Sequence, residues 1–442
     1  MTSVLHRDLK IGLPKVVRGE GCYLFDSEGR SYLDASGGAA VSCLGHSDER
    51  VIAAVREQIG TLPFAHTSFF TNQPAEALAE KLIARAPEGF GEGRAVFVGS
   101  GSEAMEVALK LARQYHVERG ETARSVFIAR RMSYHGNTLG ALSVGGHMQR
   151  RATYAPMLMN VEHIPACHPY RDIEPGETLE AYGLRRADEL ERTILAVGAD
   201  KVAAFVAEPV SGATLGSVPP VPGYFRRIRE ICDRYGVLFI ADEVMCGMGR
   251  TGTLFAIEQE GVCPDIITVA KGLGAGYQPI GGMLASRKVV AGIEAGSGTL
   301  ANGHTYMSHA VACAAALAVL EAIEEDGLVE RVERMGSLLR RRLERSFSQH
   351  PAVGDIRGRG LFQTIELVAD RDDKIPFPRS RRIAERFRER AMINGLICYP
   401  STGCADGALG DHVLLAPPYI VTEAQIDEIV EKMERTLAEV LA

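Results

Sequence analysis

The chain has 442 residues, a formal net charge of −7 and 46% hydrophobic residues, an ordinary composition for a soluble globular protein large enough for two domains. It lacks the basic surplus of a nucleic-acid-binding protein, an apolar run of about 18 residues that could span a membrane, and an apolar N-terminal segment typical of secretory signals. We therefore expect no nucleic-acid or membrane partner. The nine cysteines show no C-x-x-C spacing, which favours reduced thiols in the cytoplasm.

The first ninety residues predict two short strands within 22–34, then helices at 49–60 and 74–86. From residue 95 onward, apolar runs alternate with helical patterns, which predicts a mostly parallel sheet with right-handed crossovers. The expected strands are 95–99, 125–129, 202–207, 237–241, 266–270 and 280–286.

Between these strands, residues 151–188 read as loop-rich. Helical patterns follow at 188–197, 223–235 and 252–264.

The turn after the first of these strands has the composition of a phosphate site. Gly99-Ser100-Gly101-Ser102 precedes a helix that begins near Glu103. Small residues there expose free backbone N–H groups and the positive end of the helix dipole. Two other interpretations stay open: plain N-capping by Ser102, and the loose dinucleotide fingerprint Gly99-x-Gly101-x-x-Ala104.

Polar side chains follow several other buried strands. Tyr134 comes shortly after the strand at 125–129, Glu208 ends the next one, Asp242 follows 237–241, and Lys271 ends the strand at 266–270. The carboxyl ends of parallel strands are where open α/β sheets bind their ligands. A carboxylate after an apolar strand is costly unless it meets a cation. A desolvated lysine amine favours its neutral, nucleophilic form. The alternative for Lys271 is a side chain that simply reaches solvent.

The last third of the chain has a different pattern. Helices are expected at 306–325, 327–347 and 379–393, with a strand pair within 355–368. A closing helix begins after Thr422, and Gln425 completes a capping box with it. We assign a large domain to 60–310 and a smaller α+β domain to 1–59 with 311–442.

Together these features suit pyridoxal 5′-phosphate. The cofactor's phosphate fits a helix N-terminus, its aldehyde requires a lysine such as Lys271, and its pyridine nitrogen requires a carboxylate such as Asp242. The competing class is a nicotinamide-dependent oxidoreductase. In that class the ribose would contact Glu118 or Glu121, and Lys271 and Asp242 would be coincidental.

Five segments occur in an order that resembles one family: Gly99-Ser100-Gly101-Ser102-Glu103-Ala104, Tyr134-His135-Gly136, Ala241-Asp242-Glu243-Val244, Gly247-x-Gly249-Arg250-Thr251-Gly252 and Ala270-Lys271-Gly272. The chain resembles the class III (omega-amino acid) aminotransferases, which are fold type I pyridoxal-phosphate enzymes. The resemblance runs from about Tyr23 to the C-terminal helix. It implies an α/β fold in which a large domain with a mostly parallel sheet is joined by a smaller α+β domain.

The resemblance also implies roles for individual residues. Lys271 would bind the cofactor aldehyde and later move a proton, and Asp242 would pair with the pyridinium nitrogen. Tyr134 and Val244 would cover the two ring faces, while Thr305 would reach the phosphate of a neighbouring subunit. The expected cofactor contacts are Ser100, Gly101, Ser102, Tyr134, His135, Glu208, Asp242, Val244, Lys271 and Thr305, with no metal.

The implied activity moves an amino group from an amine or omega-amino acid to an α-keto acid such as pyruvate or 2-oxoglutarate. The implied assembly is a homodimer with active sites at its interface, or a tetramer. Decarboxylating transamination and an aminomutase reaction are alternatives on the same fold.

One position departs from the family pattern. Many members carry an arginine four residues before Asp411 that grips the substrate carboxylate, and this chain has Gly407 there. Without that arginine, Glu208 could be free to face a substrate cation.

Overall fold

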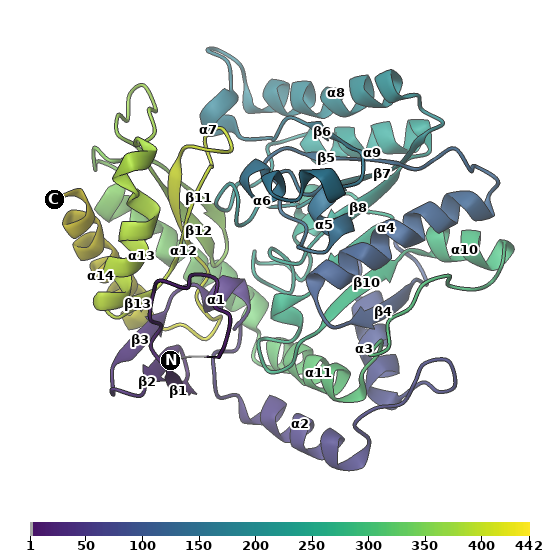
Figure 1. The fold of residues 1–442 in the computed structure, drawn as a ribbon, viewed down its shortest axis with the longest axis horizontal. Helices are drawn as coiled ribbons and strands as arrows, with labels where there is room; N and C mark the ends of the chain where they lie inside the picture. The colour runs from purple at the N-terminus through teal and green to yellow at the C-terminus, as the bar shows by residue number, and fades with distance from the viewer. Residues whose placement is uncertain (1–2) are drawn as a thin grey trace.

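The computed structural model describes residues 3–442, and a seven-stranded sheet forms its centre (Figure 1). The strand order is β4-β10-β9-β8-β7-β5-β6. The strands are β4 (Arg94–Val98), β5 (Val126–Arg130), β6 (Val161–Ile164), β7 (Val202–Ala207), β8 (Leu238–Asp242), β9 (Ile266–Val269) and β10 (Gly281–Ala285). All six expected strands are therefore present, and β6 is an addition inside the segment that reads as loop-rich.

The sheet is mostly parallel, as predicted. Strands β6, β5, β7, β8 and β9 pair in parallel, whereas β10 is antiparallel to both β9 and β4. Because β10 reverses direction between them, β4 runs in the same direction as β9. The carboxyl ends of β4, β5, β7, β8 and β9 therefore meet at one edge of the sheet.

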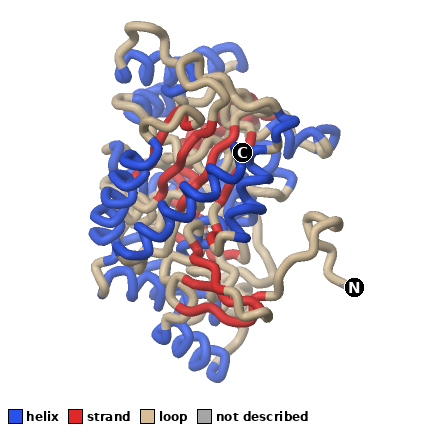
Figure 2. Tube along the Cα trace, turned by 90° about the vertical axis from the view of Figure 1, so that its left-hand side faces the viewer, coloured by secondary structure: helices blue, strands red, loops and turns tan. Residues whose placement is uncertain are grey.

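Side chains of the central strands alternate between two cores because successive residues of a strand point to opposite faces. In β7, Phe205 and Ala207 pack against α3, α8, α9 and α11, while Ala204 and Val206 pack against α4, α5 and α10. In Figure 2 the strands lie in a central layer with helices on both sides. The helices are α3 (Gln73–Ala84), α4 (Gly101–Glu118), α5 (Leu139–Val144), α6 (Met148–Ala152), α8 (Leu179–Val197), α9 (Tyr224–Tyr235), α10 (Arg287–Ala295) and α11 (Ala310–Glu325).

The two ends of the chain share a second region, on the left in Figure 1. One sheet has the order β1-β2-β3-β13, so the N-terminal strands pair with a C-terminal one, and the other has the order β11-β12-β15-β14. The strands are β1 (Val16–Glu20), β2 (Tyr23–Asp26), β3 (Ser31–Asp34), β11 (Val353–Arg359), β12 (Phe362–Leu367), β13 (Leu396–Ile397), β14 (Tyr399–Thr402) and β15 (Asp411–Leu415). The helices of the region are α12 (Leu328–Phe347), α13 (Ile383–Ile393) and α14 (Glu423–Leu441).

One hydrophobic core joins these terminal segments: Leu33 and Val51 pack in the same cluster as Val413 and Ile429. Helix α11 contributes to this core and also to the core of the large sheet. We propose the division into 60–310 and 1–59 with 311–442, with α11 as the shared element. In α14 the capping box between Thr422 and Gln425 is present as expected.

Four helix predictions need correction. The helix expected at 379–393 begins at Ile383 as α13, and Arg379–Arg381 form a separate 3₁₀ turn before it. Residues 252–264 contain only a short 3₁₀ helix, Ala256–Glu260, because the buried Glu243 carboxylate accepts the N–H groups of Ala256 and Ile257 and fixes the loop. Helix α8 begins at Leu179 rather than at 188, because the Thr178 side chain caps its first turn. Helix α11 begins at Ala310 rather than 306. No helix within residues 3–442 has both the length and the apolar character needed to cross a membrane.

A buried polar cluster joins the two regions. The Glu366 carboxylate of β12 accepts hydrogen bonds from Arg171 Nε at 2.7 Å and from Arg357 Nη1 at 2.5 Å. Arg357 also donates to the carbonyl of Gly216, which belongs to the loop after β7. His412 of β15 is fully buried against that loop, and burial, reinforced by the positive charge of Arg357, lowers its pKa to about 3.

This depressed pKa predicts a loss of stability in acid that is specific to His412. A histidine in the unfolded chain has a pKa near 6.5, so above that pH His412 is neutral in both states and its contribution to the free energy of unfolding is fully present. As the pH drops from 6.5 toward 3, the unfolded chain binds a proton that the folded protein does not, and this contribution is lost. At about pH 4.5 the loss reaches about 2–3 kcal/mol. His412→Gln, which stays neutral, should therefore lose about that much less stability than wild type between about pH 7.5 and pH 4.5 in urea unfolding. Parallel pH curves for the two proteins would contradict the assignment.

Candidate active site

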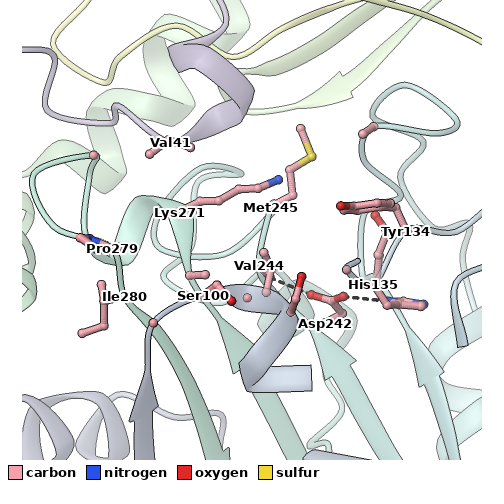
Figure 3. Close-up of a pocket in the computed structure, with 18 of the residues that line it drawn as sticks. Val41, Ser100, Tyr134, His135, Asp242, Val244, Met245, Lys271, Pro279 and Ile280 are labelled. Atoms are coloured by element: carbon pink, nitrogen blue, oxygen red, sulfur yellow. Dashed lines mark hydrogen bonds and ion pairs between the residues drawn. The ribbon is translucent and has the colours of Figure 1, made fainter. Parts of the chain in front are cut away.

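A cavity of about 470 Å³ lies at the edge where the parallel strands end. Figure 3 shows the Lys271 side chain extending across it, with Tyr134 at the far wall and Asp242 and His135 at the floor. Every residue expected at the cofactor lines this cavity except Thr305. The lining residues are Val41, Gly99, Ser100, Gly101, Ser102, Tyr134, His135, Gly136, Glu208, Ala213, Asp242, Val244, Met245, Ala270, Lys271, Gly276, Gln278, Pro279 and Ile280.

Lys271 has an unusual backbone. It is separated from the end of β9 by Ala270 alone and adopts φ +49°, in the left-handed region that costs a side-chain-bearing residue roughly 1–2 kcal/mol. Such strain concentrates at functional sites. The side chain is half-buried, and desolvation of its amine, only partly opposed by the charges of Asp242 and Glu208, lowers its pKa below the usual lysine value. The amine is therefore neutral over more of the pH range than an ordinary lysine.

Asp242, the last residue of β8, is held as an acceptor by three groups. Its Oδ1 accepts from the Val244 N–H at 3.0 Å and from the Thr268 hydroxyl at 3.3 Å. Its Oδ2 lies 2.7 Å from Nδ1 of His135. Asp242 is only 3% exposed, so these contacts offset the cost of burying a carboxylate and fix its direction.

The turn before α4 presents free backbone donors to the cavity. Ser100, rather than Ser102, caps the helix by accepting the Glu103 N–H at 3.2 Å. The Ser102 hydroxyl accepts the Asn137 N–H instead. The first N–H groups of a helix have no partner inside it, and those of Gly101 and Ser102 take part in none of the hydrogen bonds found within residues 3–442. A Cβ on Gly101 would lie 2.9 Å from the Val244 side chain, so this close approach requires glycine.

Glu208 connects two walls of the cavity. One carboxylate oxygen accepts the Tyr134 N–H at 3.1 Å, and the other accepts the Gly212 N–H at 2.7 Å. Burial raises its pKa. Each oxygen accepts one backbone N–H, which anchors Glu208 to both walls and leaves each oxygen one further lone pair, so the contact between Glu208 and a substrate cation stays a prediction.

Thr305 is exposed and lies outside the cavity of its own chain. Sequence reasoning missed Val41, Ala213, Met245 and the 276–280 segment as cavity walls. Val41 comes from the glycine-rich stretch 36–46, which is distant in the chain from the other lining residues. The glycines of this stretch predict irregular backbone, but they do not identify Val41 as a cavity wall.

Comparison with known proteins gives a consistent result. The family described as aminotransferase class-III matches residues 7–437. An uncharacterized aminotransferase of Schizosaccharomyces pombe is 48% identical over 442 residues, covering 100% of this chain and 95% of the relative. The uncharacterized aminotransferase YodT of Bacillus subtilis is 40% identical, covering 100% and 98%. The crystal structure of the omega transaminase from Pseudomonas jessenii in complex with PMP superimposes with a TM-score of 0.91 at 38% identity, covering 98% of this chain and 93% of that one.

The chain therefore belongs to the class III aminotransferase family, and its fold is that of the fold type I pyridoxal-phosphate transaminases. It is an enzyme of amino transfer, as the sequence resemblance implied. The nicotinamide-dependent alternative is not favoured, and neither are the decarboxylating and aminomutase reactions.

Proposed function

We propose that this enzyme binds pyridoxal 5′-phosphate through Lys271 and uses it to move an amino group from an amine or omega-amino acid to an α-keto acid. The observation that carries the proposal is the meeting of three groups at one cavity. These are the strained Lys271 at the end of β9, the buried Asp242 at the end of the neighbouring β8, and the free N–H groups at the start of α4.

The residues present fit this cofactor. A phosphate matches the free donors of Gly101 and Ser102, and the Ser100 and Ser102 hydroxyls lie beside them. A protonated pyridine nitrogen matches Asp242, whose carboxylate is desolvated and oriented by His135. Tyr134 and Val244 are half-buried at the cavity wall, as side chains that sandwich a flat ring would be.

When bound, the cofactor supplies an electron sink that stabilises negative charge at the substrate carbon. Lys271 Nζ then holds or moves the proton at that carbon, a task suited to an amine with a depressed pKa. The Asp242 carboxylate would hold the pyridine nitrogen, and its direction is fixed by His135 Nδ1, the Val244 N–H and the Thr268 hydroxyl, which all contact it. Glu208 keeps the Tyr134 and Gly212 walls at a fixed separation.

The functional unit in this proposal is a homodimer in which Thr305 completes the partner's phosphate site. An exposed aromatic patch supports it: Phe69 is 78% exposed, Phe70 67% and Tyr306 66%. Such a patch on a single chain indicates an interaction surface. A second cavity lined by Tyr306 shares Gly99 and the 278–280 segment with the catalytic cavity, so the patch is continuous with the site.

We also propose a cytoplasmic location. All nine cysteines carry free thiols, which supports a reducing compartment.

An absorbance spectrum of the purified protein tests the proposed function. Lysine-linked pyridoxal phosphate should absorb at roughly 410–420 nm. The band should vanish on addition of a donor amine and return with pyruvate or 2-oxoglutarate. Sedimentation of the same sample should show twice the 47.7 kDa chain mass. A protein without the band after incubation with the cofactor would defeat the cofactor assignment, and a 47.7 kDa species alone would defeat the shared site.

A further inference from the structure

One arginine contacts a side chain that lines the cavity and takes part in none of the ion pairs found within residues 3–442. Arg150 belongs to α6, and its guanidinium carbon lies 4.6 Å from the ring centroid of Tyr134, a wall of the cavity. The side chain is exposed. Arg130, by contrast, already binds protein groups. It is 3% exposed and donates to the Glu208 carbonyl and to the Ser211 hydroxyl.

The short helix that carries Arg150 is anchored on two sides. Arg151 Nη1 donates to the carbonyls of Leu142 and Gly145, at 3.2 and 2.7 Å, and fastens α6 to α5. Gln149 Nε2 lies 3.3 Å from the Ala408 carbonyl and fastens α6 to the loop 403–410. The backbone at Arg150 is therefore held in place while its guanidinium stays available.

In the described part of the chain, the cavity wall lacks a free cation that could bind the carboxylate of a keto acid. Its wall contains two carboxylates, Asp242 and Glu208, and a single cation, Lys271, which is committed to the chemistry. A keto acid brings a further carboxylate, which binds best to a planar, permanently charged guanidinium. Arg150 is close enough that its charge contributes to the lowered pKa of Lys271.

The loop beside α6 offers no competing cation. Gly407 has φ +92°, and a Cβ built there would point toward Met148 of α6, 4.0 Å from its Cγ. Any longer side chain at 407 would enter the space beside α6, but the chain carries only a hydrogen there.

We propose that Arg150 binds the carboxylate of the α-keto acid acceptor, with the Tyr134 ring supporting the guanidinium through a cation–π contact. This proposal rests on the proposed function and names the residue that selects carboxylate-bearing acceptors at the same site. The Tyr134 ring has two faces, so one face can cover the cofactor ring while the other contacts the Arg150 guanidinium. A bidentate contact from its fork of N–H groups would fix the position of the keto carbon relative to Lys271.

The test compares Arg150→Gln and Arg150→Lys with Arg388→Gln. Arg388 is an exposed arginine of α13 outside the cavity lining, so its variant controls for the loss of one positive charge. A monoamine without a carboxylate is the donor, and pyruvate and propanal are the acceptors. We expect the KM for pyruvate to rise about 10–100-fold in Arg150→Gln, with a smaller rise in Arg150→Lys. The KM for propanal, which lacks the carboxylate, and the kcat values should stay near those of Arg388→Gln.

A direct binding measurement accompanies the kinetics. Titration calorimetry with propionate, which cannot react, should show the same loss of affinity in Arg150→Gln. Equal changes in KM for pyruvate and propanal, or unchanged propionate binding, would overturn the proposal for Arg150. Failure of the wild-type enzyme to transaminate either acceptor would instead overturn the proposed function, while propionate binding would still decide the role of Arg150.

Discussion

Lys271→Ala should lower the turnover of amino transfer by about five to six powers of ten, the loss seen when an enzyme's essential nucleophile is removed. The variant should also lack the absorbance at roughly 410–420 nm that marks lysine-linked cofactor. The reason is that Lys271 is the sole amine among the residues that line the cavity. Steady-state assays and spectra of the purified variant measure both effects.

Two further variants sharpen this prediction. Lys271→Arg keeps the positive charge, but a guanidinium does not lose its proton, so the variant should be as inactive as alanine. Lys110→Ala, on the exposed face of α4, removes a lysine outside the cavity and should leave activity unchanged. Retained turnover in Lys271→Ala would refute the assignment of this residue.

The backbone at Lys271 explains how the site is prepared. A lysine at φ +49° between β9 and the following 3₁₀ turn cannot relax without shifting the ends of the neighbouring strands. The strain is therefore supported by the packing of the whole sheet. The lowered pKa of its amine has the same origin, because the cavity that holds the side chain also removes it from water.

Much of this arrangement could be predicted from the sequence because it is local. Glu208 directly follows an apolar strand, Asp242 ends one and Lys271 comes two residues after one, and the parallel sheet brings those ends together. The sequence also predicts the turn and the helix after β4, although α4 begins at Gly101, two residues before the expected Glu103. The identity of the cap could not be predicted, because Ser100 and Ser102 are both good cap residues and only the backbone geometry selects Ser100.

Other parts of the site depend on contacts between distant segments and could not be predicted in this way. Val41 reaches the cavity from the N-terminal region, which joins the C-terminal strands through β3 and β13. Arg150 contacts Tyr134 from α6, a helix that is also hydrogen-bonded to the loop 403–410, more than 250 residues further along the chain. No periodicity or spacing encodes either approach. For the same reason β6 was missed: four residues of modest hydrophobicity became a strand only because β5 was there to pair with them.

The contact between His135 and Asp242 could be predicted only in part. The two residues follow different strands, and the sequence placed each at the carboxyl edge of the sheet. It did not show that Nδ1 of His135 would lie 2.7 Å from the carboxylate. A buried carboxylate with three hydrogen-bond partners keeps a fixed direction, as a partner for a protonated ring nitrogen must.

Asp242→Asn should therefore retain the cofactor but lose about two to three and a half powers of ten in kcat, the equivalent of about 3–5 kcal/mol for removing the charged partner of a buried pair. Asparagine has the same shape but presents an NH₂ group where a carboxylate oxygen now contacts His135 or Val244, so either one of these hydrogen bonds breaks or His135 changes its tautomer. The neutral amide also leaves the ring nitrogen without a counter-charge.

Cofactor content and single-turnover rates measure the two consequences separately. Asp200→Asn, at an exposed position outside the cavity, is the matched control and should behave as wild type. A kcat for Asp242→Asn within a few-fold of wild type would show that Asp242 does not carry the charge of the site. A variant that folds but fails to hold the cofactor would show that Asp242 acts in binding rather than in turnover. The predicted combination of retained cofactor and lost turnover is the result expected of a residue that acts on the electronic state of the ring.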